Sequence, residues 1–538
     1  MEQRTSAGRA AAGARAPFAW LLVALAAQTL AGCSGGGDNL QVSTDPQTLR
    51  QRCTALTGTT LGASAAQVSA AALMPASGAT PEYCSVNAQM TGSQLKMQLN
   101  LPIAGWNGKL AFLGGGGFDG VMAAFTASYN SASIQTDRYA TMGTNGGHDE
   151  AATDPNYFKA TFATDPQQLA DYTHLADHRS LPVGKQLIKQ FYGAAPTRSY
   201  FEGCSMGGHD ALIEAQRYPD DFDGIVARAP AGNVMGLFTQ FNRIAKAVRV
   251  PAATLDGGKQ TLLANAVLAQ CDSLDGANDG IVSNPSACHF DPTVLRCPAG
   301  ADTGDSCLSD AQIATVQTIT TPFSTTDGSI THPGYNFGLE NSADGWGSYI
   351  WPQAAAGNDS LQGLFSDGFI RSFITGDQSY NTSLYDPNQW GPQLASIGTM
   401  FEAFDPDLSA LHAHGARLIL LNGTNDTSVS PRDTARYYES VVTKLGQSTA
   451  DDTVELFLEP GVGHCTGGVG PDQVDLLKAL VTWTEQGTPP SKQSLTLTKL
   501  DTDGAVTASR PLCRYPAYPR YKGSGSLSDA ANYACSTQ

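Results

Sequence analysis

Short apolar runs and amphipathic segments alternate in two stretches of the chain, and this order restricts the fold more than any other feature. The first stretch lies between residues 109 and 230, and the second between 416 and 487. In both, runs of strand length are followed by segments whose apolar residues recur at helical spacing. Such a β-α-β order is typical of a doubly wound, mostly parallel sheet. We therefore predict an α/β fold.

The alternation stops between residues 233 and 405, where four cysteines, acidic turns and many Gly, Ser and Asn residues replace it. A sheet pattern that stops and then resumes indicates an insertion. We predict that residues 46–232 and 406–538 form the main domain. Residues 233–405 are then a lid domain that covers the carboxyl-terminal edge of the sheet.

The first 32 residues have the features of an export signal. Arg4, Arg9 and Arg15 precede the apolar run Phe18–Leu30, which is too short to span a membrane comfortably. The run leads into Leu30-Ala31-Gly32-Cys33, which is similar to the lipobox of bacterial lipoproteins; an ordinary secretory signal is the alternative. We predict an exported protein, either secreted or a periplasmic or outer-membrane lipoprotein. Lipid on Cys33 would be its only membrane contact, and residues 33–45 would be a tether.

The bulk composition is that of a globular protein and argues against one class of partner. Of the 538 residues, 41% are hydrophobic and 15% are charged. The formal net charge is -17, so we do not expect a nucleic-acid partner.

The chain has 11 cysteines. With Cys33 set aside for lipid, an exported protein is expected to pair the others in disulfides. Short separations favour four local pairs: Cys53–Cys84, Cys271–Cys288, Cys297–Cys307 and Cys513–Cys535. Cys204 and Cys465 are left over. Their spacing does not decide between a bond that joins them and a reactive free thiol.

Residues 203–207, Gly-Cys-Ser-Met-Gly, form a G-x-S-x-G motif. The motif is common by chance, but here a strand pattern, "RSYFEG", precedes it and a helix pattern, "GHDALIEAQRYPD", follows it. A nucleophile elbow needs this strand–turn–helix context, with small residues at Gly203 and Gly207 so that the turn can close. We predict that Ser205 is a nucleophile and that the sheet is of the α/β-hydrolase type.

A serine nucleophile needs a general base, and the base needs an orienting carboxylate. In this type of sheet the acid follows the serine in the chain, and the histidine follows the acid. Asp426 follows the apolar run 417–422, and His464 follows the run 454–459 in a glycine loop. We predict a triad of Ser205, Asp426 and His464. Three further aspartates are rivals for the acid: Asp405, Asp407 and Asp433.

The oxyanion that forms during acyl transfer needs two preset N–H donors. We expect the first from Met206, directly after the nucleophile. The second is expected from the glycine run 114–117, where Gly117 is the choice and Gly116 the rival.

G-C-S-x-G-G at 203–208, with H-C-x-G-G at 464–468, resembles the tannase and feruloyl esterase family. Segments 200–230, 271–282 and 510–535 resemble it too, so the similarity covers nearly the whole chain after the signal. It implies a disulfide between Cys204 and Cys465, and hydrolysis of carboxylic esters of aromatic acids. "NGGHD" and the C-terminal segment are most similar to members that cleave terephthalate monoesters. This chain differs from them at Gly116 and Met206, where they have serine and glutamate.

The segment "CDSLDGANDGIVSNPSAC" (271–288) crowds three carboxylates between glycines. Carboxylates so close repel one another unless a cation lies among them, and oxygen donors without His or Cys favour Ca²⁺ over zinc. A calcium site in the lid is also implied by the resemblance. We expect a structural Ca²⁺ held by three side chains and two backbone carbonyls: Asp272, Asp275, Asp279, Ala277 and Ile281.

We expect the lid to set substrate specificity. The resemblance suggests that Arg371 binds a substrate carboxylate, although it is also compatible with a surface arginine. Trp346, Tyr349 and Trp351 are candidates for stacking on an aromatic acid, with core packing as the alternative. The expected substrates are terephthalate monoesters, feruloyl esters or galloyl esters. A catalytically silent, calcium-stabilised surface-binding protein is the alternative function, and a peptidase is a weaker one.

Overall fold

The computed structural model describes residues 42–538 apart from 63–64, 79, 123–128, 151–152 and 155. Residues 42–538 form one compact unit. The predicted export signal, Cys33 and most of the tether lie outside the described residues, so they stay predictions. In the part of the chain that is described, no helix combines the length and apolar character needed to cross a membrane.

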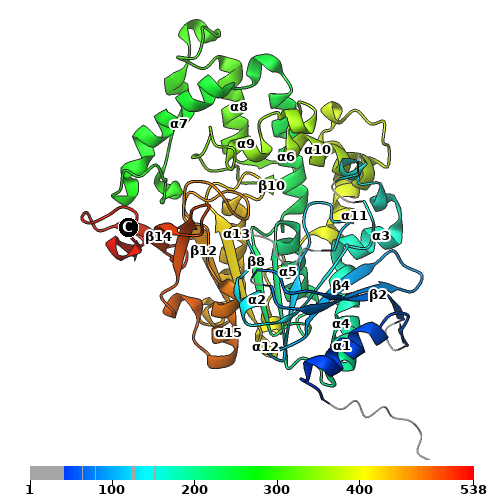
Figure 1. Ribbon diagram of the computed structural model, residues 1–538. Helices are drawn as coiled ribbons and strands as arrows, with labels where there is room; N and C mark the ends of the chain where they lie inside the picture. Colours follow the sequence, from blue (N-terminus) through cyan, green and yellow to red (C-terminus); the bar gives the residue numbers. More distant parts are fainter. Residues whose placement is uncertain (1–41, 63–64, 79, 123–128, 151–152, 155) are drawn as a thin grey trace, which may run out of the picture. The chain divides into compact units, whose positions relative to one another are not determined.

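Among the described residues, ten strands form the main sheet in the order β1-β2-β3-β4-β6-β5-β7-β8-β11-β12. The strands from β6 to β12 in this order are parallel to their neighbours, which confirms the α/β prediction (Figure 1). Their bounds are Ala140–Thr144 for β6, Lys109–Leu113 for β5, Arg198–Cys204 for β7, Gly224–Arg228 for β8, Arg417–Gly423 for β11 and Val454–Glu459 for β12.

An antiparallel extension continues the sheet beyond β6 and was not predicted. It consists of β1 (Thr60–Leu61), β2 (Ala66–Met74), β3 (Tyr83–Met90) and β4 (Lys96–Pro102). Strand β2, "AQVSAAALM", is rich in alanine and shows little contrast between its two faces, whereas β4, "KMQLNLP", alternates polar and apolar residues. Helix α1 (Pro46–Ala55) packs on it and is joined to β3 by the Cys53–Cys84 disulfide.

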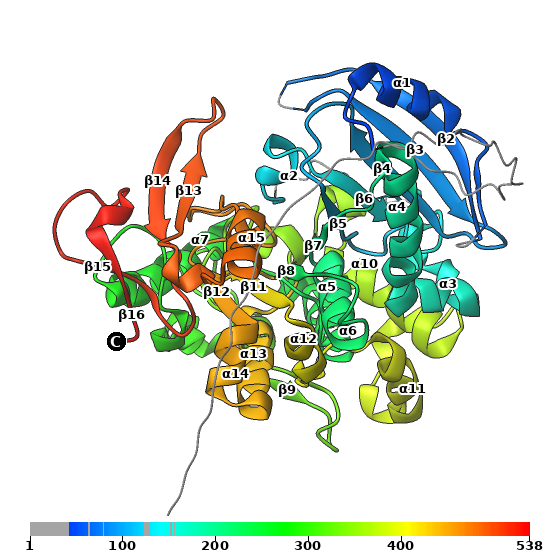
Figure 2. The same cartoon turned by 90° about the horizontal axis from the view of Figure 1, so that it is seen from below.

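Helices cover both faces of the parallel strands (Figure 2). Alternate residues of β5 belong to two separate hydrophobic cores, one on each face of the sheet, as expected from the period of two in a strand. Leu110 and Phe112 belong to a core shared with α4 (Ala176–Tyr192), α5 (Met206–Arg217) and α13 (Pro431–Leu445). Ala111 and Leu113 belong to a second core, built with α15 (Leu476–Gln486).

Residues 233–405, all of them described, enter the chain between β8 and β11 and add no strand to the main sheet. They form helices α6 (Val234–Val248), α7 (Gly257–Cys271), α8 (Asp310–Thr320), α10 (Leu361–Gly368) and α11 (Gly391–Phe401). Their core also takes Phe118, Phe162 and Tyr172 from the segment between β5 and α4. The division into a main domain and a lid domain stays a prediction.

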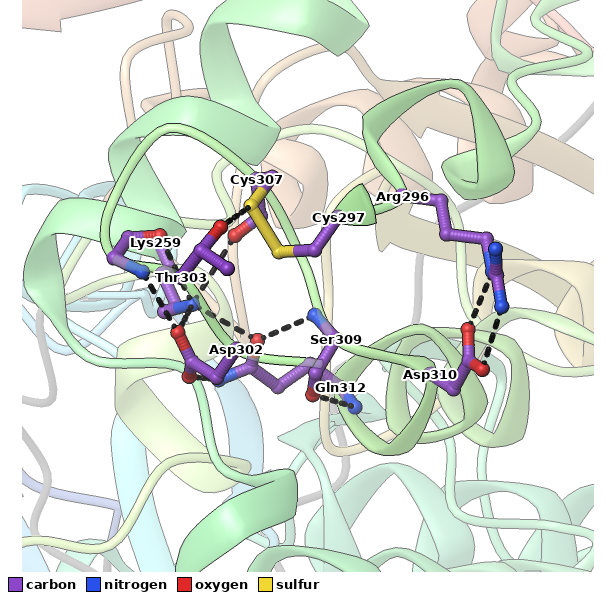
Figure 3. The surroundings of a disulfide bond; sticks show 10 residues. Lys259, Arg296, Cys297, Asp302, Thr303, Cys307, Ser309, Asp310 and Gln312 are labelled. Atoms are coloured by element: carbon purple, nitrogen blue, oxygen red, sulfur yellow. Dashed lines mark hydrogen bonds and ion pairs between the residues drawn. A yellow bond between two sulfur atoms is a disulfide. The ribbon is translucent and has the colours of Figure 1, made fainter. Parts of the chain in front are cut away.

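A disulfide and a buried lysine hold one corner of this insertion (Figure 3). The Cys297–Cys307 bond closes a short loop. Beneath it, Lys259 Nζ donates to Asp302 Oδ1 at 2.9 Å, to the Cys307 carbonyl at 3.1 Å and to Gln312 Oε1 at 3.1 Å. A fourth acceptor, the Gly304 carbonyl, lies 3.3 Å from the same nitrogen. The lysine is almost fully buried, and Asp302 and the other oxygen acceptors compensate its charge.

Candidate active site

Ser205 lies at the turn between β7 and α5, where φ is 63° and ψ is -118°. A non-glycine residue adopts such a conformation at a cost of about 1–3 kcal/mol. Glycine at the flanking positions makes the turn possible, since a Cβ on Gly203 would lie 2.3 Å from the Gly207 carbonyl oxygen. The hydroxyl group is thereby placed at the N-terminus of α5, where the helix dipole favours negative charge. This is the geometry of a nucleophile elbow.

His464 and Asp426 form a hydrogen-bonded pair, with 2.8 Å between Nδ1 and Oδ2. The other oxygen, Oδ1, accepts the N–H groups of Ser428 at 2.8 Å and Val429 at 2.9 Å, so the carboxylate is fixed. Because Nδ1 carries the proton and donates this hydrogen bond to Asp426, the Nε2 lone pair is available to a serine hydroxyl. In the described part of the chain, no protein group bonds to this Nε2 atom.

Ser205 Oγ and His464 Nε2 form no hydrogen bond within the described residues. Such contacts are often long in ligand-free enzymes and tighten when substrate binds. The structure brings none of the rival acids to His464. Asp433 pairs with Arg436, and Asp407 with Lys444 at 3.1 Å, while Asp405 is exposed.

A disulfide between Cys204 and Cys465 ties the serine loop to the histidine loop, with 6.0 Å between the Cα atoms. Each cysteine is the direct neighbour of a predicted catalytic residue, Ser205 or His464. The described residues also contain the four local bridges favoured by sequence spacing. The covalent link limits how far the serine and the imidazole can separate.

The glycine loop after β5 packs directly on the elbow, because the Gly207 N–H donates to the Gly115 carbonyl at 3.1 Å. The Gly116 N–H is taken by Asp119 Oδ1 at 2.7 Å, which removes the rival oxyanion donor. Among the described residues, no protein group accepts the N–H of Gly117 or of Met206. These two donors are the ones predicted for the oxyanion hole.

A pocket with an empty volume of about 470 Å³ opens at Ser205, Gly117 and Met206. Helix α6 forms one wall, and no described residue that lines the pocket carries a charge. Besides Ser205, the polar side chains among the described lining residues are those of Tyr349 and Ser428, each with a hydroxyl group. The lining consists of Gly117, Ser205, Met206, Ala231, Val234, Leu237, Phe238, Phe241, Tyr349, Phe365, Ser428 and Val429.

Arg371 does not line this pocket. Its Nε atom donates to the Tyr380 carbonyl at 3.1 Å, and its guanidinium lies 3.6 Å from the Asp367 carboxylate. Of the three aromatic candidates, only Tyr349 reaches the pocket, where its ring also meets that of His464 edge-on at 5.3 Å between centroids. Trp346 and Trp351 are buried in the core of the insertion.

The pocket wall on α6 was missed by sequence reasoning. Val234, Leu237, Phe238 and Phe241 recur at helical spacing, but the same pattern is typical of any core helix. A weak signal was available, since the helix begins only a few residues after β8 and therefore near the active edge of the sheet.

The acidic loop of residues 271–288 meets some of the requirements of a binding site for a hard cation such as Ca²⁺. Asp275 is fully buried, and its Oδ2 atom has no hydrogen-bond partner among the described residues, while burial raises the pKa of this carboxyl. Asp279, in contrast, accepts from Arg510 Nη2 at 2.5 Å and from the Tyr533 hydroxyl at 3.1 Å. Within the described part of the chain, no three His, Cys, Asp or Glu side chains converge closely enough to hold a metal ion. A bound ion would therefore need Asp279 to leave Arg510.

Comparisons with known proteins agree with this geometry. The family described as "Tannase and feruloyl esterase" matches residues 82–536. The chain is 32% identical to mono(2-hydroxyethyl) terephthalate hydrolase of Piscinibacter sakaiensis, over 85% of this chain and 85% of that one. It is 29% identical to feruloyl esterase B of Aspergillus niger, over 80% of this chain and 82% of the relative.

The crystal structure of feruloyl esterase B from Aspergillus oryzae is also similar, with a TM-score of 0.79 and 26% identity. It covers 91% of this chain and 100% of its own. Fold, family match and relatives agree with the resemblance seen in the sequence. The chain therefore belongs to the tannase and feruloyl esterase family and is a carboxylic ester hydrolase.

Proposed function

We propose that this protein is an exported serine esterase that acts through an acyl-Ser205 intermediate. Its substrates are esters of aromatic acids whose acyl group carries no charge. The observation that carries the proposal is the uncharged pocket, which opens at Ser205 between the two free N–H donors. The names of two relatives, a terephthalate monoester hydrolase and a feruloyl esterase, support the class of aromatic acid esters.

The geometry supports a two-step acyl transfer. Ser205 Oγ attacks the ester carbonyl while His464 Nε2 takes the hydroxyl proton, and Asp426 stabilises the imidazolium. The N–H groups of Gly117 and Met206 bind the oxyanion. His464 then gives the proton to the leaving alcohol, and water, activated by the same imidazole, releases the acid from Ser205.

The pocket favours a neutral acyl group over one with a free carboxylate. A buried carboxylate without a cation costs several kcal/mol, and the pocket lining offers no cation. The hydroxyls of Tyr349 and Ser428 are suited to a phenol or methoxy substituent, as in a ferulate ester. We therefore place feruloyl-type esters ahead of terephthalate monoesters.

The test compares mono(2-hydroxyethyl) terephthalate with bis(2-hydroxyethyl) terephthalate, which differ in one free carboxylate, alongside methyl ferulate and methyl gallate. We expect kcat/KM to be about 100-fold higher for the neutral diester than for the monoester. The Ser205→Ala variant is the control for background hydrolysis. Equal rates for the two terephthalates would contradict the neutral-acyl proposal. No Ser205-dependent hydrolysis of any ester would leave the surface-binding alternative.

We further propose export and a structural Ca²⁺. Five disulfides among the described residues are typical of proteins outside the reducing cytosol. Fractionation of cells that produce the full chain and a Cys33→Ser variant tests the lipid anchor. For Ca²⁺, the unpaired buried oxygen of Asp275 and the oxygen-only donor set support the proposal. Metal analysis of purified protein tests it.

A further inference from the structure

A group of carboxyl side chains lies behind the glycine loop that carries the oxyanion donor; all are buried except Asp210, whose side chain is 15% exposed. They come from the loop after β5, from η3 (Asp171–Leu175), from α4 and from α5, and they surround a small cavity. Glu214 is almost fully buried, and its Oε2 atom has no partner among the described residues. The carboxyl groups are those of Asp119, Asp171, Asp177, Asp210 and Glu214.

Two of these carboxyl groups hold the glycine loop by its backbone. Asp119 accepts the Gly116 N–H at 2.7 Å, and its own N–H donates to the Gly116 carbonyl at 3.0 Å. A backbone hydrogen bond from Gly115 reaches the carboxyl group of Asp210. Asp210 is on α5, four residues after Met206 at the start of the helix. It therefore connects the segment that carries one oxyanion donor to the helix that carries the other.

The contacts of the neighbouring His209 indicate which side chain carries the proton between His209 and Asp210. His209 Nε2 is 2.9 Å from the Phe401 carbonyl oxygen, which only accepts, so Nε2 carries a proton. Burial lowers the pKa of His209 to about 4, so its other nitrogen, Nδ1, is a bare acceptor at neutral pH. Asp210 Oδ1 lies 3.2 Å from Nδ1. A hydrogen bond across this contact requires that Asp210 supplies the proton.

The surroundings favour this neutral form. Asp119, Asp177 and Glu214 face Asp210, and burial raises the pKa of each well above its usual range. Two cations act on this region: Arg179 is paired with Asp171, and Arg217 donates to the Thr399 and Glu402 carbonyls; burial lowers the pKa of His174. Burial likewise raises the pKa of Asp210 to about 8.

We propose that Asp210 is a positioning residue for the oxyanion hole: its protonated carboxyl group holds Gly115 and donates to His209, which fixes the glycine loop against α5. The role rests on the proposed esterase function. When Asp210 loses its proton, it loses the bond to His209 and places a negative charge behind the loop. The charge opposes the oxyanion that forms at Gly117 and Met206. Turnover should therefore fall as pH rises through about 8.

The test uses Asp210→Ala, Asp210→Asn and, as a matched control, Asp220→Asn, whose side chain is exposed. We expect Asp210→Ala to lower kcat at pH 7 by about 10-fold with KM changed less than about 2-fold, because a misplaced donor affects the transition state most. The amide of Asp210→Asn makes both hydrogen bonds of the protonated acid, so it should restore most of the lost kcat. It should also remove the fall of kcat above pH 8, which Asp220→Asn should keep.

Two outcomes would overturn the proposal: an alkaline fall of kcat that persists in Asp210→Asn, or an Asp210→Asn variant as impaired as Asp210→Ala. The proton can also be tested without substrate. Because the folded state keeps a proton that the unfolded chain loses near pH 4, the contribution of Asp210 to stability should be complete below pH 4 and fall as pH rises toward 8. Asp210→Asn should flatten this fall in Tm. Parallel Tm curves for the wild type and Asp210→Asn would overturn the proposal, whether or not an ester is hydrolysed. A failure to hydrolyse any ester would remove only the proposed function.

Discussion

The catalytic edge of the sheet and the wall of the inserted segment meet at one pocket, but they differ in how their side chains are held. Asp426 and His464 are fixed by hydrogen bonds, and a disulfide ties the histidine loop to the serine loop. The wall on α6 contributes Leu237, Phe238 and Phe241, which are held by packing alone. Polar, directional contacts thus define the chemistry, and non-directional apolar contacts define what fits.

The difference has a consequence for substitutions. A hydrogen bond or a disulfide is lost completely when one partner changes, whereas an apolar wall tolerates a change of shape. Substitutions at the catalytic edge should therefore lower turnover by orders of magnitude. Substitutions in the insertion should change substrate preference or stability.

The largest effect is expected for Asp426→Asn. The amide cannot hold the His464 tautomer that leaves Nε2 free, so kcat should fall by about 10⁴-fold with little change in KM. Steady-state kinetics on methyl ferulate measure this. Asp433→Asn is the matched control, because the side chain of Asp433 pairs with Arg436 instead. If the control were the inactive variant, the acid would be misassigned.

The next effect is expected for the double variant Cys204→Ser and Cys465→Ser. The bridge spans 261 positions, so chain entropy predicts a loss on the order of 5 kcal/mol in the free energy of unfolding, and looser loops should lower kcat at least about 10-fold. Urea unfolding and kinetics measure both. Removing Cys513–Cys535, which spans 22 positions, should cost about 3 kcal/mol and leave kcat intact. Equal kcat losses in both variants would show that the bridge has no positional role.

Removal of calcium should affect stability alone. We expect a chelator to lower Tm by several degrees and to leave kcat at 25 °C unchanged, because a structural ion in the loop 271–288 binds only the folded state. Asp275→Asn should lower Tm and abolish the response to the chelator. A Tm that does not respond in the wild type would remove the calcium proposal.

The smallest effect is expected for Arg371→Ala. Because Arg371 contacts Tyr380 and Asp367 instead of the pocket, kcat/KM should stay within about 2-fold of wild type on charged and neutral esters alike. A selective loss of activity on mono(2-hydroxyethyl) terephthalate would show that the insertion moves to bring this arginine to the substrate.

The elements that hold the catalytic residues could be predicted because each is a local pattern. The strand "RSYFEG" and the helix after Ser205 carry their own periodicities and became β7 and α5. The antiparallel strands of residues 60–102 were not predicted. Strand β2 is rich in alanine and gives little contrast between its faces, whereas the alternation of polar and apolar residues in β4 is a signal that sequence reasoning missed. The position of Arg371 outside the described pocket lining could not be predicted either, because only packing decides which way its side chain points.

The sequence by itself determined the parallel sheet, the elbow at Ser205 and the order of the three candidate catalytic residues, Ser205, Asp426 and His464. These depend on periodicity and on the small residues that a tight turn requires, and both can be read along the chain. Only the tertiary structure decided that the described lining of the pocket carries no charge and that Asp210 lies 3.2 Å from a histidine whose other nitrogen contacts the Phe401 carbonyl. The burial and the charge around a side chain depend on residues that are distant in the chain, and no local sequence pattern shows which of these residues come into contact.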